Sequence, residues 1–149
     1  MQMIIWFLRP GCRITQGQIR ERAMGNRDNA TMTVTEIRRG FNRLGFDSNR
    51  RNRGFTWARV RRQITIRRPI LVRIGWSYRS GGHAVVIRGY DNRRGHPRRL
   101  YVNDPLPRPH GSEHNPRFER FRDHADFTRN GNGSSRGQWT TMLHNIRRQ

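Results

Sequence analysis

Residues 81–105 constrain this chain most, because two apolar runs lie on either side of a short polar connection. The first run begins with Gly-Gly-His83 and continues as Ala-Val-Val-Ile, and the second is Leu-Tyr-Val followed by Asn103, Asp104 and Pro105. Apolar runs joined by a polar, Gly-containing segment predict an antiparallel β-hairpin. Such a hairpin brings His83 and Asp104 together at one end.

A His beside a carboxylate is a candidate general base. The carboxylate holds one ring nitrogen, and the other nitrogen can then take a proton from a nucleophile. His–Asp pairs are also common as purely structural pairs, and Asp104-Pro105 can simply begin a turn. Spacing alone favours the structural interpretation, and both interpretations stay open at this point.

The segments before the hairpin are mainly helical in pattern. Residues 1–8 are apolar and end at Pro10-Gly11, so we expect the last turns of a helix that begins upstream of Met1. Three further helices each start with a Thr at the N-cap or first position. The first has only a rough apolar stripe, and the other two carry apolar residues at helical spacing. Their expected ranges are 15–24, 35–45 and 57–67.

The remaining segments predict an antiparallel sheet with irregular connections. The expected strands are 70–76, 83–90, 99–103 and, as a last edge strand, 138–144. We expect a polar Arg-rich loop at 47–53, an irregular Pro-rich segment at 105–116, a short element packed through Phe118, Phe121 and Phe127, and a flexible turn at 130–137. Helices followed by a sheet indicate an α+β fold, with residues 1–149 as one domain.

The net charge is the most unusual property of the composition. The formal net charge is +21, and all 31 basic residues are Arg. A positive field of this size attracts nucleic acid or acidic partners. The Arg residues are spread along the whole chain, however, and an Arg-only repertoire also results from GC-rich codons. A solvated basic surface is therefore favoured, and binding to nucleic acid or to an acidic partner through that surface is the alternative.

Other reactive side chains give weaker signals. Cys12 is the single Cys, so no disulfide can form within the chain. His110 and His114 are four residues apart, but they lie among Pro, Gly and Asn with no Cys nearby, so a zinc site is not favoured. Each Trp lies among apolar residues and is interpreted as part of the core; these are Trp6, Trp57, Trp76 and Trp139.

No segment indicates where the protein resides. The apolar run at residues 3–8 is too short to span a membrane, and no charged region precedes it as in an export signal. The localisation is left open, and no membrane span is expected.

Three blocks of sequence together resemble the papain-like cysteine peptidases of the C39-like and AvrRpt2-like group. Two flanking segments extend the resemblance, so that it covers about residues 1–143. The blocks are Pro-Ile-Leu-Val-Arg-Ile-Gly-Trp at 69–76, Gly-Gly-His-Ala-Val-Val-Ile-Arg-Gly-Tyr-Asp at 81–91 and Leu-Tyr-Val-Asn-Asp-Pro at 100–105, with Ile-Thr-Gln-Gly-Gln-Ile at 14–19 and Gly-Gln-Trp-Thr at 137–140 as the flanking segments.

The resemblance implies a papain-like fold and a Cys–His–Asp peptidase site that acts on a peptide or protein without a cofactor. By position, His83 is the family's base. Asp104 is its orienting residue, with Asn103 as the runner-up because more distant relatives use Asn. The thiolate would attack the peptide carbonyl, and His83 would take and return the proton.

The sequence departs from the family at the nucleophile. The family's Cys-Trp-Ala-like motif begins the first helix, after an oxyanion-stabilising Gln, and neither is present before residues 1–8. Cys12 follows the apolar run, so it would lie at the wrong end of that helix. We therefore expect an N-terminally truncated papain-like domain that supplies the His and Asp of the site but does not hydrolyse peptides as it stands. Either a longer protein supplies the thiol, or the chain is a remnant of the fold.

Overall fold

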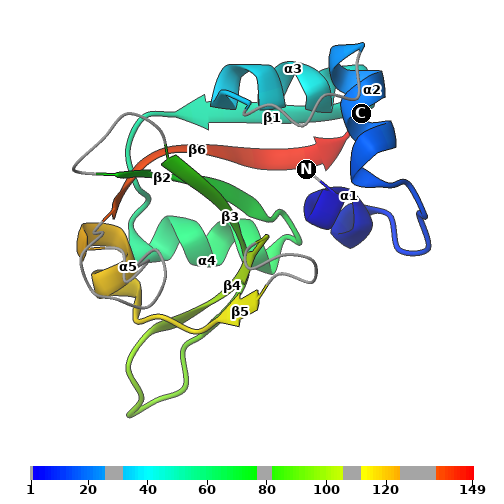
Figure 1. Ribbon diagram of the computed structural model, residues 1–149. Coiled ribbons are helices and arrows are strands. Elements are labelled where there is room, and N and C mark those ends of the chain that lie inside the picture. Colours follow the sequence, from blue (N-terminus) through cyan, green and yellow to red (C-terminus); the bar gives the residue numbers. More distant parts are fainter. Residues whose placement is uncertain (1, 26–31, 77–81, 106–111, 125–136) are drawn as a thin grey trace.

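A six-stranded antiparallel sheet with helices on both faces forms the protein, whose structure is a computed structural model (Figure 1). The structure describes residues 2–25, 32–76, 82–105, 112–124 and 137–149. The strand order is β1-β6-β2-β3-β4-β5. Helices precede most of the sheet in the chain, so the predicted α+β arrangement is confirmed.

The helices begin where capping chemistry favours them. Thr15 and Thr33 each form a capping box, in which the Thr hydroxyl accepts a backbone N–H and the third helical residue bonds back to the Thr N–H. The capping Thr of the second box is Thr33, so the prediction that Thr35 begins this helix was two residues late. The helices are α1 (Gln2–Leu8), α2 (Gln16–Met24), α3 (Val34–Arg43), α4 (Trp57–Thr65) and α5 (Phe118–His124).

The strands around the hairpin agree with the predicted ranges to within a residue or two. Those strands are β2 (Ile70–Trp76), β3 (Gly82–Asp91) and β4 (Arg99–Asp104). Beyond them lie β1 (Phe46–Arg51), β5 (Ser112–His114) and β6 (Gly137–Arg148). The β2–β3 and β3–β4 pairs are antiparallel, as the hairpin pattern requires.

Two predictions for the sheet were wrong. The segment predicted as a polar loop at 47–53 overlaps β1, which pairs with β6 although Phe46 is its only large apolar residue. β6 was predicted to be an edge strand, but it lies between β1 and β2. Both errors have one cause, since β1 covers β6 through backbone pairing that leaves no apolar alternation in the sequence.

The Pro-rich segment and the segments near the C-terminus are described only in part. Within 105–116, which was expected to be irregular, the short strand β5 pairs with β4. Phe118 and Phe121 are buried on α5, as expected. Phe127 and the expected turn at 130–136 lie outside the described residues.

Each face of the sheet carries its own hydrophobic core. The α4–α5 core contains side chains from α4 and α5 together with alternate residues of the strands, including Val72, Val85, Val102 and Met142. The α1–α3 core lies on the other face and contains Ile4, Ile19, Phe41, Val86 and Leu143. A residue's place in the strand alternation therefore decides which core it faces.

The Trp residues divide between the core and the sheet end. Trp57 and Trp139 are buried in the α4–α5 core, as predicted, and Trp76 is only partly buried against it. The side chain of Trp6 lies outside what the structure describes.

In the described part of the chain, none of the helices is both long and apolar enough to cross a membrane.

Candidate active site

The β3–β4 register places His83 and Asp104 on the same face of the sheet. Ile87 pairs with Val102, and both belong to the α4–α5 core. Counting back along β3 in steps of two reaches Val85 and then His83, and counting forward along β4 reaches Asp104. The two residues are therefore diagonal neighbours across the strand pair, as the sequence predicted.

The two side chains form a short, buried hydrogen bond. His83 Nε2 lies 2.5 Å from Asp104 Oδ1, and the side chains are only 13% and 7% exposed. An acceptor-only carboxylate at this distance fixes the proton on Nε2, so that Nδ1 is the ring nitrogen with the lone pair. In this tautomer Nδ1 is the nitrogen able to take a proton from a thiol.

An aromatic side chain holds the plane of the imidazole. The Trp76 ring stacks on the His83 ring with centroids 6.3 Å apart and an interplanar angle of 12°. Trp76 lies at the end of β2, and Ile74 of the same strand pairs with His83. Sequence analysis placed Trp76 in the core, whereas the structure gives it this contact at the edge of the candidate site.

Gly82 is required beside His83 because the backbones of β2 and β3 approach closely there. A Cβ atom at position 82 would lie 2.4 Å from the carbonyl oxygen of Ile74. Any other residue would push β3 away from β2 at the point where the His begins its strand. The Gly of the sequence motif thus has a steric reason in this fold.

Asn103, the runner-up for the orienting role, lies on the opposite face of the sheet from Asp104. Its Cα partner is Val86 of the α1–α3 core. The Asn103 Oδ1 accepts a hydrogen bond from Arg88 Nε at 2.7 Å, and Arg88 also forms an ion pair with Glu113 at 2.7 Å. Of the two candidates, only Asp104 contacts His83.

His114 is a neighbour of Asp104 that sequence reasoning did not assign to this site. Its Nε2 lies 3.7 Å from Asp104 Oδ2, so the carboxylate lies between two imidazoles. The contact arises because β5 pairs with β4, with His114 opposite Val102. The only sequence signal was the four-residue spacing from His110, which suggested a metal instead.

The candidate zinc pair gains no support from the fold. His110 lies outside the described residues, so its position relative to His114 is not given. Within the described ranges, no group of three or more His, Cys, Asp or Glu side chains is placed to hold a metal ion.

Cys12 packs on the opposite side of the sheet from His83. It is partly buried against the α1–α3 core, in the connection that follows α1. His83 lies on the face of the α4–α5 core. The sheet therefore separates this thiol from the imidazole.

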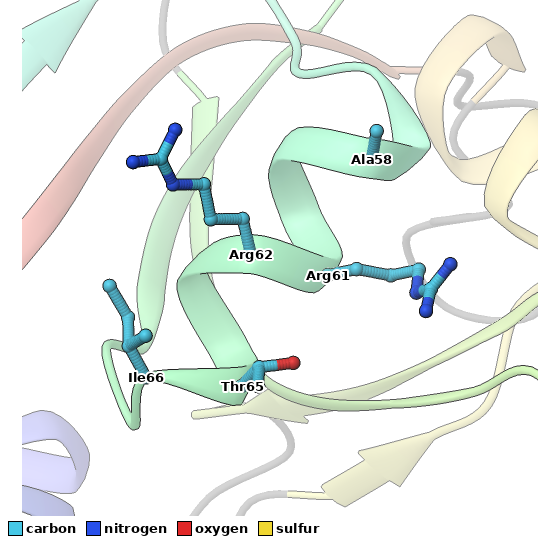
Figure 2. A pocket seen from close by; sticks show the side chains of 5 residues that line it. All are labelled: Ala58, Arg61, Arg62, Thr65 and Ile66. Carbon is cyan, nitrogen blue, oxygen red and sulfur yellow. The ribbon is translucent and has the colours of Figure 1, made fainter.

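A shallow pocket lies on the outer surface of α4, away from the His–Asp pair. Ala58, Arg61, Arg62, Thr65 and Ile66 line it, and the Arg61 and Arg62 side chains extend to opposite sides of the helix (Figure 2). Neither His83 nor Asp104 contributes to this pocket. It does not identify a substrate cleft for the candidate site.

Comparison with protein families agrees with the resemblance in the sequence. A family model described as the Peptidase_C39 like family matches residues 13–134, which include both His83 and Asp104. No curated protein matches the chain at a significant level.

Proposed function

Because the chain belongs to the C39-like cysteine peptidase family, we propose that His83 and Asp104 are the base and the orienting residue of a Cys–His–Asp peptidase site. The 2.5 Å contact between His83 Nε2 and Asp104 Oδ1 is the observation that carries this proposal. Family membership also implies a papain-like fold and a peptide or protein substrate. We propose that residues 1–149 belong to one such domain.

The proposed chemistry follows from the tautomer. With Nε2–H donating to Asp104, Nδ1 takes the proton of a thiol, and the thiolate attacks the peptide carbonyl to give an acyl-enzyme. The imidazolium then returns its proton to the leaving amine, and Asp104 stabilises the cation during the transfer. A water molecule finally hydrolyses the thioester with His83 again acting as base.

The thiol in this proposal is not Cys12, since the sheet lies between Cys12 and His83. We propose that a Cys outside the 149 residues completes the site, and that the chain alone does not hydrolyse peptides. The DNA immediately upstream of the Met1 codon tests this directly. An in-frame Cys-Trp codon pair is expected there, and an in-frame stop codon between Met1 and any Cys codon would contradict it.

The roles of Asn103 and Asp104, the last two residues of β4, are tested in the chain extended by that upstream segment. Asp104→Asn leaves the shape of the site intact but favours the wrong tautomer of His83, so kcat should fall by about 10²–10⁴-fold. Asn103→Ala is the matched control, because Asn103 lies on the other sheet face, and it should leave kcat near the parent value. The opposite pattern, with Asn103→Ala inactive and Asp104→Asn active, would reassign the orienting role.

A further inference from the structure

Two basic side chains, Arg51 and His144, contact the Phe55 ring, outside the proposed peptidase site. The guanidinium carbon of Arg51 lies 5.7 Å from the centre of the Phe55 ring. The His144 ring meets the same Phe ring edge-on, with centroids 4.9 Å apart. Arg53 and Arg59 lie close enough to act electrostatically on this group. We call Arg51, Arg53, Arg59 and His144 the Phe55 cluster.

Arg53 and Arg59 repel the positive charge of Arg51 in the Phe55 cluster. Burial lowers the pKa of Arg51, and the charges of Arg59 and Arg53 lower it further. Burial likewise lowers the pKa of His144, and Arg51 and Arg59 add to the effect. Arg51 and His144 thus both lie against the Phe55 ring, and further Arg side chains act electrostatically on each of them.

The neighbouring elements do not supply the missing negative charge. Within the described parts of the chain, none of the Asp or Glu side chains forms an ion pair with Arg51, Arg53 or Arg59, and Arg51 Nε and His144 Nδ1 are buried without a hydrogen-bond partner. From α4 and β6, the neutral Gln63 and Asn145 bond to each other, and Arg68 donates to Asn145.

We propose that the Phe55 cluster is a binding site for a phosphate group. The planar guanidinium groups of Arg match the oxygen geometry of phosphate, and an anion here would remove the repulsion between the cations. Phosphate is preferred to chloride because its oxygens can accept hydrogen bonds from several N–H groups at once, including the unpartnered Arg51 Nε. The phosphate group has two possible sources, free inorganic phosphate and the backbone of a nucleic acid. The proposal does not depend on the peptidase function.

Thermal unfolding of the 149-residue chain tests the site with inorganic phosphate as the probe. At constant ionic strength, replacing chloride by phosphate should raise Tm along a saturable curve, since a ligand that binds only the folded state stabilises it. Arg59→Met should weaken the apparent phosphate affinity by about tenfold, and Arg51→Met should do at least as much. Arg59 is exposed, so its removal leaves the fold intact even if the Arg51 variant is unstable.

Arg61→Met is the matched control on the same helix. Arg61 extends away from Arg62 in Figure 2 and lies over the Tyr90 ring, 5.8 Å from its centre, rather than at Phe55. This variant should keep the phosphate response of the parent chain. A Tm that does not respond to phosphate, or a response equally strong in the Arg59 and Arg51 variants, would overturn the proposal.

A second readout follows His144 itself. The pKa of His144, measured by NMR titration of its ring protons, should rise when phosphate is present, and Arg59→Met should abolish the rise. A His144 pKa that is the same with and without phosphate would also overturn the proposal. Both readouts are independent of peptidase activity.

A single-stranded oligonucleotide distinguishes the two sources of phosphate. In one outcome, the oligonucleotide raises Tm and the pKa of His144 at phosphate-group concentrations far below those that inorganic phosphate needs. If it does so, and Arg59→Met reduces its binding, the site binds the backbone of a nucleic acid. If only inorganic phosphate raises them, the site takes the free ion. Either result supports the phosphate site, whereas oligonucleotide binding that is unchanged in Arg59→Met, with no response to inorganic phosphate, contradicts it.

Discussion

At the scale of single residues, the fold gives Asp104 a position that its neighbour Asn103 cannot share. Adjacent residues of a strand face opposite sides of a sheet, so only one of them can reach His83. Asp104 is buried between His83 and His114, whereas Asn103 accepts from Arg88 on the other face. The choice between two consecutive side chains thus depends on strand register.

We predict that Asp104 fixes the proton of His83 on Nε2. NMR should detect a ring N–H at His83 Nε2 that exchanges slowly with water, and Asp104→Ala should abolish this signal. The same substitution should lower the free energy of unfolding by about 1–3 kcal/mol, because it leaves a buried donor without its acceptor.

Asn103→Ala is the control for this measurement, and it should retain the Nε2–H signal. A His83 ring protonated only on Nδ1 in the parent chain, or an unchanged signal in Asp104→Ala, would show that Asp104 does not set the tautomer.

His144 should make the fold sensitive to mild acid. Burial and two nearby Arg side chains lower its pKa in the folded state, whereas in the unfolded chain it titrates near its ordinary value of about 6.5. Below that pH the unfolded state binds the proton first, so stability should fall as the pH drops from about 7 towards the lowered folded-state pKa.

Urea unfolding in phosphate-free buffer at pH 7.5 and 5.5 measures this loss. His144→Gln removes the titrating group, so the variant should lose less stability between the two pH values than the parent chain. Equal losses in the two proteins would mean that His144 titrates alike in the folded and unfolded states.

At the scale of elements, the helices and strands that could be predicted are those marked by a short, local sequence pattern. The β3–β4 hairpin, strand β2 and the Thr15 cap all carry short patterns that the structure reproduces. β1 carries no such pattern, since the run after Phe46 is polar and pairs with β6 from far along the chain. His114 was likewise missed as a neighbour of Asp104, because its place depends on a three-residue strand within a Pro-rich segment.

The close approach of β2 and β3 predicts contrasting effects for two Gly substitutions. Gly82→Ala puts a Cβ atom 2.4 Å from the Ile74 carbonyl oxygen, so it should lower the free energy of unfolding by about 1–3 kcal/mol. Gly17→Ala lies in α2 with no atom within 4 Å of the new Cβ, and it should stabilise by about 0.5–1 kcal/mol. Denaturant titration checks both values, and a neutral Gly82→Ala would refute the close packing at the start of β3.

At the scale of the whole molecule, the sheet separates the His–Asp pair from the thiol of Cys12. His83 and Asp104 lie on the side of the α4–α5 core, and Cys12 packs against the α1–α3 core. The sequence motifs predicted that His83 and Asp104 form a pair, and the position of Cys12 after the first apolar run predicted that it is not their partner thiol. Which face each residue occupies became apparent only with the register of the strands.

Cys12→Ser should therefore leave the peptidase activity of the chain extended upstream unchanged, and it should change the free energy of unfolding of the 149-residue chain by no more than about 1 kcal/mol. A fluorogenic peptide assay and denaturant titration on the parent and variant check this. Peptidase activity in the 149-residue chain that disappears in Cys12→Ser would identify Cys12 as the nucleophile and contradict the assignment.

The most direct test of the central claim is the rate at which a thiol-directed epoxide labels the proposed upstream Cys. It is measured at neutral pH in the chain extended upstream to include that Cys, with Cys12 replaced by Ser. If His83 is the base, the thiol is largely ionised only when the imidazole is present, so His83→Ala should slow labelling sharply. Labelling that continues undiminished in His83→Ala would remove His83 from the mechanism.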